Sequence, residues 1–288
     1  MQPNKEHSVD LHSHTRYSDG SLGVVELLAH VDQHGVKTLA ITDHDSIGAH
    51  LEIDSLRASH SFDSTINVIP GIEISTQFGS REVHIVGLGI DIHDDGLNCF
   101  VKNQQAYRRD RLQQYAEKLE KVGISGVGEK INSLTADSLT RTHLSQILVE
   151  MGAVQDPQRA FKRLIGRKGR AYVKAHWPSI EKVVDTIKVA GGIAVIAHPG
   201  RYQLNRKQLR ELVDQFSSAG GEAIELSYPN AEPQMIKWLT ELAKSHQLLG
   251  SQGADFHNPE WKWLKPGFFP SLPKEIEPVF ERLSILTS

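Results

Sequence analysis

Histidines and carboxylates follow or interrupt nearly every apolar run of this sequence, and these side chains could hold metal ions. The first run leads into His12 and His14, which are two residues apart and would lie on the same side of an extended backbone. Asp19 also follows this first run, and the same residue types recur at the later runs, at Asp43, His44, Glu73, His84, His198, Asp255 and His257. Mixed imidazole and carboxylate donors suit Mn²⁺, Zn²⁺ and Fe²⁺. The pattern therefore predicts a site for more than one metal ion.

The elements that must position these residues alternate between strands and helices. Runs rich in β-branched residues predict strands at 9–12, 37–42, 66–75, 82–90, 193–197, 223–226 and 248–251, and helix-like stretches follow most of them. Such units imply a mainly parallel sheet, and about seven of them favour a closed barrel. The third and fourth runs are too close for a helical crossover, which predicts an antiparallel hairpin or an irregular connection. Because barrel sites lie at the carboxyl ends of the strands, the candidate ligands should converge at one rim.

The middle of the chain has a different character. One long helical pattern at 100–122 and shorter ones at 140–151 and 157–165 are followed by a basic turn at 166–170. Residues 100–175 contain 15 Lys and Arg against 7 Asp and Glu, a net charge of +8, whereas the remainder carries −11. We expect a metal-binding barrel at 1–94 and 176–288, with a basic helical insertion at 95–175 that covers the active site. This charge would attract a phosphorylated substrate, although a solvated helical surface would carry it equally well.

The overall composition restricts the class of protein. Of 288 residues, 39% are hydrophobic and 23% are charged, which excludes an extensively disordered chain. A single cysteine, Cys99, excludes an intrachain disulfide framework and a cysteine-rich zinc module. The sequence has neither a signal-like leader nor an apolar stretch near the roughly 20 residues that span a bilayer. We therefore expect a cytoplasmic protein with no membrane contact and no obligate protein partner.

Six motifs, in order along the chain, resemble those of the PHP (polymerase and histidinol phosphatase) superfamily. They are Asp-Leu-His-Ser-His-Thr at 10–15, Thr-Asp-His-Asp at 42–45, Gly-Ile-Glu-Ile-Ser at 71–75, the strand around His84, Ala-His-Pro at 197–199 and Ala-Asp-Phe-His at 254–257. The runs at 169–173 and 197–202, together with the insertion, are similar to stand-alone bacterial members. Those members are 3′,5′-nucleotide bisphosphate phosphatases and 5′–3′ exoribonucleases acting on short RNA. The resemblance implies an α/β fold, a distorted (β/α)7 barrel, and three divalent metal ions.

The resemblance also implies how the ligands divide, and each ligand position holds a suitable residue type. His12, His14, Glu73 and Asp255 would hold one metal ion, Glu73, His84 and His198 a second, and Asp19, His44 and His257 a third. Asp10 and Asp43 would orient the ligating imidazoles. Mn²⁺ is the expected metal, with Zn²⁺ and Fe²⁺ as alternatives.

Metal ions that share a water can hydrolyse a phosphate ester without a protein nucleophile. Asp19, Glu73, His257 and Arg201 are the expected catalytic residues. Arg201, three residues after His198, is the candidate contact for the reacting phosphate. Arg170, and Arg141 with His143, are candidates for a second phosphate, unless they are solvated surface residues.

The predicted function is hydrolysis of the 3′-phosphate of nucleoside 3′,5′-bisphosphates, such as pAp to AMP. Stepwise trimming of short 5′-phosphorylated RNA is an extension of the same activity. One alternative is a histidinol phosphate phosphatase, which the metal site would serve equally well. Another is a catalytically silent nucleic-acid-binding module.

Overall fold

The computed structural model of the chain describes residues 8–61 and 64–286, so the first seven residues of the expected barrel range lie outside the described residues. Its strands are β1 (Val9–Asp10), β2 (Thr38–Ile41), β3 (Asn67–Phe78), β4 (Arg81–Leu88), β5 (Ile193–Ile196), β6 (Ala223–Ser227) and β7 (Leu249–Gln252). Its helices are α1 (Val24–Gln33), α2 (Gly48–Ala58), α3 (Asp95–Lys121), α4 (Val127–Asn132), α5 (Arg141–Glu150), α6 (Pro157–Ala160), the π-helical η2 (Phe161–Ile165), α7 (Ile180–Val189), the 3₁₀ turn η3 (Pro199–Arg201), α8 (Arg206–Ser218), α9 (Pro233–Ser245) and α10 (Val279–Leu286). No helix among these is long and apolar enough to cross a membrane.

The seven strands form one sheet in which neighbours in sequence are neighbours in space. The pairs β1–β2, β2–β3, β5–β6 and β6–β7 are parallel. Strand β4 is antiparallel to both β3 and β5, because a tight turn at residues 79–80 connects β3 directly to β4. The predicted antiparallel pair is therefore confirmed, and it is the source of the distortion of the barrel.

Backbone hydrogen bonds bring the end of β7 beside β1 and nearly close the sheet. The amide of Leu11 donates to the carbonyl of Gln252 at 3.0 Å, and that of Asp255 donates to the carbonyl of His12 at 2.9 Å. Gly253 permits this approach, since a Cβ at this position would lie 2.4 Å from the Cβ of His12. The predicted fold class, an α/β barrel of seven strands, is thus confirmed.

Alternation along the strands divides the barrel interior into an apolar part and a polar part. Ile69 on β3, Val86 on β4 and Ala223 on β6 belong to one buried cluster with Leu11 and Ala40. Alternate side chains of a strand share a face. Glu73 is four residues from Ile69, His84 is two from Val86 and Glu225 is two from Ala223, so each lies on the same face as its apolar partner. The intervening residues, such as Ile72, Ile85 and Ile224, pack in the cluster that includes α7, α8 and α9. The histidines and carboxylates therefore lie at one end of the barrel interior, and the apolar cluster fills the rest of it.

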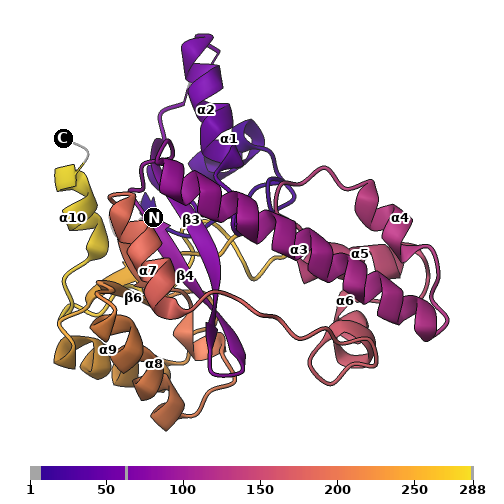
Figure 1. Cartoon of the computed structure of the whole chain (residues 1–288). Helices are drawn as coiled ribbons and strands as arrows, with labels where there is room; N and C mark the ends of the chain where they lie inside the picture. The colour runs from indigo at the N-terminus through magenta and orange to yellow at the C-terminus, as the bar shows by residue number, and fades with distance from the viewer. Residues whose placement is uncertain (1–7, 62–63, 287–288) are drawn as a thin grey trace.

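The segment between β4 and α7 extends away from the barrel along α3 (Figure 1). Helix α3 begins at Asp95, five residues before the predicted start, because the Asp94 side chain caps it by accepting from the Leu97 amide at 2.7 Å. Helices α4, α5 and α6 gather at the far end of α3 (Figure 1) and enclose an apolar cluster of their own. Its buried members are Leu112, Tyr115, Ala116, Leu119, Val127, Ile131, Leu139, Leu144, Ile147, Leu148, Ala160, Leu164, Ile165, Ala171 and Val173.

Candidate metal centre

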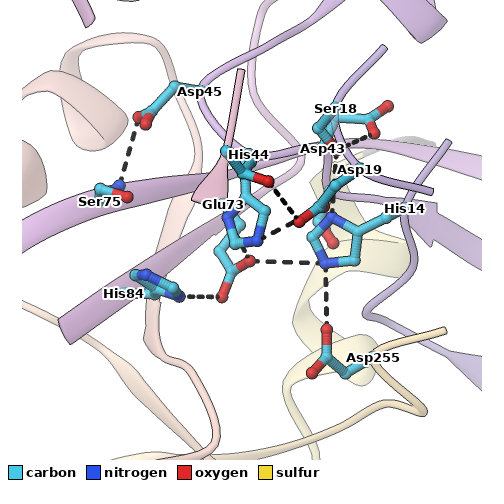
Figure 2. A network of polar contacts seen from close by, with 12 residues as sticks. His14, Ser18, Asp19, Asp43, His44, Asp45, Glu73, Ser75, His84 and Asp255 are labelled. Atoms are coloured by element: carbon cyan, nitrogen blue, oxygen red, sulfur yellow. Dashed lines mark hydrogen bonds and ion pairs between the residues drawn. The ribbon is translucent and has the colours of Figure 1, made fainter. Parts of the chain in front are cut away.

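Glu73 lies at the middle of a buried group of imidazoles. Its Oε1 atom lies 2.9 Å from both His84 Nδ1 and His198 Nε2. Its Oε2 atom lies 2.9 Å from His44 Nδ1 and 3.4 Å from His12 Nε2. Figure 2 shows His44, His84 and His14 approaching this carboxylate from different sides. One carboxylate from β3 thus contacts imidazoles that follow or belong to four other strands, which is the geometry of a shared ligand.

Asp255 and Asp19 complete the group on the other side of His14. Asp255 Oδ1 lies 3.1 Å from His14 Nε2 and 3.4 Å from His12 Nε2. Asp19 Oδ1 lies 3.3 Å from His257 Nε2 and 3.8 Å from His44 Nε2. The His14 and His257 rings stack with centroids 4.0 Å apart.

Three overlapping sets of donor atoms, each within 4.8 Å of one another, could hold a metal ion. The sets are His12, His14, Glu73 and Asp255; His14, Asp19, His44 and His257; and His44, Glu73 and His84. The first matches one of the ligand sets that the resemblance implied. The second set consists of the implied ligands Asp19, His44 and His257 together with His14. The third contains His44 in place of His198, which the resemblance implied as a partner of Glu73 and His84. His198 contacts Glu73 Oε1 from another direction.

The unsatisfied polar atoms of the described residues test whether this cluster fits metal ions. Eight buried side-chain atoms have no hydrogen-bond partner, and five belong to the cluster: His12 Nε2, Asp19 Oδ1, His44 Nδ1, Glu73 Oε2 and His198 Nδ1. A buried polar atom left without a partner costs about 1–3 kcal/mol, so such atoms are rarely concentrated in one place. All five can offer an electron pair to a cation. The residue types and their unsatisfied atoms therefore fit divalent metal ions.

The protonation of the cluster reflects its dense charge. Burial opposes ionisation of Glu73, yet His44 and His84 hold the pKa of this carboxyl well below its usual value. Burial also opposes protonation of His84, but Glu73 and Glu82 raise its pKa to about 10. In the same way Asp19 and Asp255 raise the pKa of His257 to about 9 against its burial. At neutral pH these two imidazoles carry protons that a metal ion would displace.

Three residues at the ends of strands adopt left-handed backbone conformations that are uncommon for residues other than glycine. They are Asp45 (φ 43°) after β2, His198 (φ 28°) after β5 and Asp255 (φ 52°) after β7. The amide of Asp45 donates to the Glu73 carbonyl at 2.9 Å, and that of His198 donates to Glu225 Oε2 at 2.6 Å. Strained backbone of this kind concentrates at functional sites. Here the side chains of His198 and Asp255 lie in the cluster, whereas that of Asp45 pairs with Arg108 beside it.

Glu225 supports two histidines of the cluster and was not predicted from the sequence. Its side chain is 2% exposed, and its Oε1 atom lies 3.0 Å from His12 Nδ1. The same carboxylate accepts the His198 amide hydrogen bond, so it fixes one ring and one backbone. A glutamate inside the apolar run Ala-Ile-Glu-Leu of β6 was the available signal.

The two aspartates expected to orient imidazoles bond mainly to other groups. Asp10 accepts hydrogen bonds from the amides of His12, Ala254 and Gly267, and burial raises its pKa to about 6. Asp43 accepts from the amide and hydroxyl of Thr15 and from the hydroxyl of Ser18, which lies 3.4 Å from His14 Nδ1. Asp10 therefore fixes the loop backbones, and Asp43 reaches an imidazole through Ser18.

The predicted phosphate contacts differ in their distance from the cluster. Arg201 forms an ion pair with Asp255, and its guanidinium lies 5.4 Å from the centre of the Tyr228 ring. Arg141 pairs with Glu82 at 3.3 Å, and Glu82 in turn lies 3.7 Å from His84 Nε2. Arg170 is exposed in the turn after η2. The structure thus brings Arg201 and Arg141 to the site and leaves Arg170 at the surface.

Two cavities flank Asp19, which lines both. The smaller, of about 140 Å³, is also lined by His44, His84 and three arginines, namely Arg108, Arg111 and Arg141. The larger, of about 640 Å³, is lined on its other sides by residues that include Arg16, Tyr17, His143, Asn258 and Trp261. His143 lines only the larger cavity, and its Nδ1 accepts the Thr140 amide hydrogen bond at 3.0 Å.

Arg108 and Arg111 on α3 were also missed by the sequence interpretation. Arg108 pairs with Asp45 at 2.7 Å, while Arg111 lies 3.6 Å from the Glu82 carboxylate that Arg141 also contacts. The cavity is therefore lined by three guanidinium groups, which face the carboxylates of Asp19 and Glu82 in its wall and of Asp45 beside Arg108. Both arginines continue the helical spacing of Leu112, Tyr115 and Leu119, and this continuation of a buried stripe could have identified them.

Comparison with known proteins places this site in a family. The model of the PHP domain matches residues 10–228, which include the end of β1, all of β2–β6 and all but two of the expected metal ligands. The chain belongs to the PHP domain family. This membership and the His/Asp/Glu cluster indicate that divalent metal ions are the cofactors.

The relatives of this PHP chain extend over almost its whole length. It is 40% identical over 274 residues to the 5′-3′ exoribonuclease Rnm of Escherichia coli K12, covering 94% of this chain and 92% of the relative. It is 34% identical over 278 residues to the 3′,5′-nucleoside bisphosphate phosphatase of Chromobacterium violaceum, covering 96% of both. A solved structure of an amidohydrolase from Chromobacterium violaceum, with bound sulfate, has a TM-score of 0.86 and 33% identity and covers 97% of this chain and 96% of that one.

Proposed function

We propose that this PHP chain is a phosphate-ester hydrolase that removes the 3′-phosphate of nucleoside 3′,5′-bisphosphates and trims short 5′-phosphorylated RNA from its 5′ end. The observation that carries the proposal is the small arginine-lined cavity directly beside the metal-ligand cluster. Such a cavity would bind a second phosphate that does not react. The name of one relative, a 3′,5′-nucleoside bisphosphate phosphatase, describes a substrate with two phosphates, and the name of another describes degradation of RNA from the 5′ end.

The proposed cofactors are three divalent metal ions, with Mn²⁺ as the expected ion and Zn²⁺ or Fe²⁺ as alternatives that the same donors accept. The ligands would be His12, His14, Asp19, His44, Glu73, His84, His198, Asp255 and His257. When bound, such ions lower the pKa of water and withdraw negative charge from a phosphoryl group. Glu73, with both oxygens directed at imidazoles from different strands, would be the bridging ligand.

The chain itself would position the substrate around this centre. Arg201 would move from Asp255 to the nonbridging oxygens of the reacting phosphate, because a guanidinium binds phosphate oxygens bidentately. Arg111 and Arg141, which share Glu82, would hold the second phosphate. The Thr140 hydroxyl donates to Asp19 Oδ2 at 2.9 Å, so the insertion is tied to a proposed ligand. We propose on this basis that residues 95–175 form the cover of the active site.

Both activities break the same bond. In a 3′,5′-bisphosphate, the oxygen of water bonds to the 3′-phosphorus, the P–O3′ bond breaks, and O3′ takes a proton to leave a nucleoside 5′-phosphate. In 5′-phosphorylated RNA, the same step at the first linkage releases a nucleoside 5′-phosphate and leaves a 5′-phosphate on the shortened chain. The distance from the 5′-phosphate to the reacting phosphorus is therefore the same kind of spacing in both substrates, and one arrangement of the arginine-lined cavity and the metal centre would accept both.

A substrate panel in Mn²⁺ tests the proposal. We expect adenosine 3′,5′-bisphosphate to be hydrolysed with a kcat/KM at least about tenfold above that of 3′-AMP, because one charge-assisted phosphate contact is worth roughly 1.5–3 kcal/mol. Arg141→Ala should remove most of this preference, whereas the exposed Arg170→Ala should retain it. A strong preference for histidinol phosphate would overturn the assignment. RNA binding that persists in chelator, with no product formed in Mn²⁺, would indicate a silent binding module instead.

A further inference from the structure

A row of aromatic rings extends from the metal-ligand cluster to the surface. The His14 and His257 rings lie 4.0 Å apart, and the His257 and Trp261 rings lie 5.9 Å apart at 28°. Trp261 and Trp263 follow with centroids 6.1 Å apart and planes within 6° of parallel. Trp263 is 60% exposed, so the row ends in an open ring face. An exposed ring face at the end of a stacked row can stack with a further planar group, such as a nucleic-acid base.

The larger cavity lies along the same path. Its volume of about 640 Å³ is in the range of small-molecule sites, and its wall runs from Asp19 to Asn258 and Trp261. The exposed Lys262 and Lys265 flank Trp263 in the sequence. Stacking rings interleaved with cations are the elements that bind single-stranded nucleic acid, because every base has a π-face and every linkage has a negative charge.

We propose that the larger cavity, Trp261 and Trp263 bind the RNA nucleotides downstream of the broken bond. This inference rests on the proposed function. The reacting phosphate must lie at the cluster, and the 5′-phosphate occupies the small cavity on one flank of Asp19. The downstream chain needs a separate path from the cluster, and the larger cavity, which shares Asp19 alone with the small one and includes Trp261 of the ring row, offers that path. A bisphosphate has no nucleotide there, so this surface acts on oligonucleotides alone.

The occupant follows from the position and charge of this surface. Trp263 also lines an apolar hollow with Phe268, which taken alone would suit a protein partner. The ring row, however, is continuous with a proposed metal ligand, His257, and the neighbouring lysines complement a phosphate backbone. Single-stranded RNA satisfies both features.

The test compares a 5′-phosphorylated RNA hexamer with adenosine 3′,5′-bisphosphate on the same protein. In Trp263→Ala, the ratio of kcat/KM for the hexamer to kcat/KM for the bisphosphate should fall about tenfold, which is the loss of one stacked base. Trp263→Phe should restore most of the ratio. The matched control is Phe268→Ala, which removes a ring that is 71% exposed in the same segment but outside the row. Its ratio should equal that of the wild type.

A binding measurement separates this inference from the proposed function. Titrating metal-depleted protein with the hexamer should quench tryptophan fluorescence, and Trp263→Ala should weaken binding about tenfold. Equal hexamer binding and an equal ratio in wild type and Trp263→Ala would overturn the inference. So would a wild type that hydrolyses the bisphosphate but neither binds nor cleaves the hexamer, and the proposed phosphatase function would stand. Hydrolysis of neither substrate would overturn the proposed function, while the titration would still decide the RNA surface.

Discussion

Replacing Glu225 by glutamine tests whether the buried carboxylate behind His12 sets the metal affinity of the centre. The substitution keeps the shape of the side chain and removes its charge. In the native protein one oxygen contacts His12 Nδ1 at 3.0 Å and the other accepts the His198 amide at 2.6 Å. Glutamine has one acceptor oxygen and one amino group, so it cannot accept from both partners at once.

The expected loss follows from what Glu225 does to the two ligands. With the carboxylate gone, His12 loses the partner that fixes its ring with Nε2 directed at Glu73 and Asp255. Loss of such an orienting partner typically weakens metal binding 10- to 100-fold, or about 1.4–2.7 kcal/mol. If the amino group instead faces the His198 amide, the strained backbone of His198 (φ 28°) loses its restraint.

The assay is competition of Mn²⁺ between the protein and a fluorescent chelator, with circular dichroism to confirm the fold. Glu225→Gln should bind Mn²⁺ at least about tenfold more weakly than wild type. The matched control is Glu241→Gln, at a side chain that is 66% exposed and paired with Lys244, and it should bind as the wild type does. Unchanged affinity in a folded Glu225→Gln protein would refute the argument that this carboxylate orients His12.

Three further predictions concern pH, the insertion and barrel closure. The pKa of His84 is about 10 and that of His257 about 9, so a metal ion must displace protons from both at neutral pH. The Mn²⁺ affinity should therefore rise between pH 7 and 9 by about tenfold per pH unit for each displaced proton. A Mn²⁺ affinity independent of pH would contradict this prediction. Arg108→Met removes the main charge partner of Asp45 and leaves that carboxylate buried, so the free energy of unfolding in urea should fall by about 3 kcal/mol. Adding Asp45→Asn to the same chain should restore part of this loss. Gly253→Ala places a Cβ 2.4 Å from that of His12 and should lower both Tm and metal affinity, whereas the open position Gly79→Ala should affect only stability.

The strand order and most residues of the cluster could be predicted because they depend on local patterns. A buried strand that ends in a polar residue is visible in the sequence. Because the active sites of such barrels lie at the carboxyl ends of the strands, residues at these separate strand ends are expected to meet at one rim. Asp19, His44 and His257 approach one another for this reason, although they come from three segments. The hairpin of β3 and β4 was predictable because the gap between the predicted strands, residues 76–81, is too short for a helical crossover.

The residues that were missed or misplaced depend on contacts between distant segments, so their sequence signals alone were weak. In the sequence Glu225 is an isolated glutamate within an apolar strand. Its side chain faces the barrel interior because it lies two residues from Ala223, whose side chain belongs to the interior cluster. In the sequence Arg108 and Arg111 belong to a basic helix that could be fully solvated. Their burial depends on their ion pairs with Asp45 and Glu82, which lie in distant segments. Arg170 was expected near a phosphate, but the tight turn at 166–170 leaves its side chain exposed.

Under the proposed function, the phosphatase and exoribonuclease activities differ in what remains attached to the reacting phosphate, not in the bond that breaks. The metal ligands therefore cannot distinguish a phosphatase from an exoribonuclease, because they contact only the group common to both substrates. The distinction must lie where a downstream nucleotide would be placed, beyond Asp19 on the side of Trp261. A chain that lacked this open flank would stop at bisphosphates, and one that has it can accept RNA through the same centre. Substitutions at Trp261 and Trp263 should consequently change which substrate is preferred, while substitutions at Glu73 should abolish hydrolysis of both.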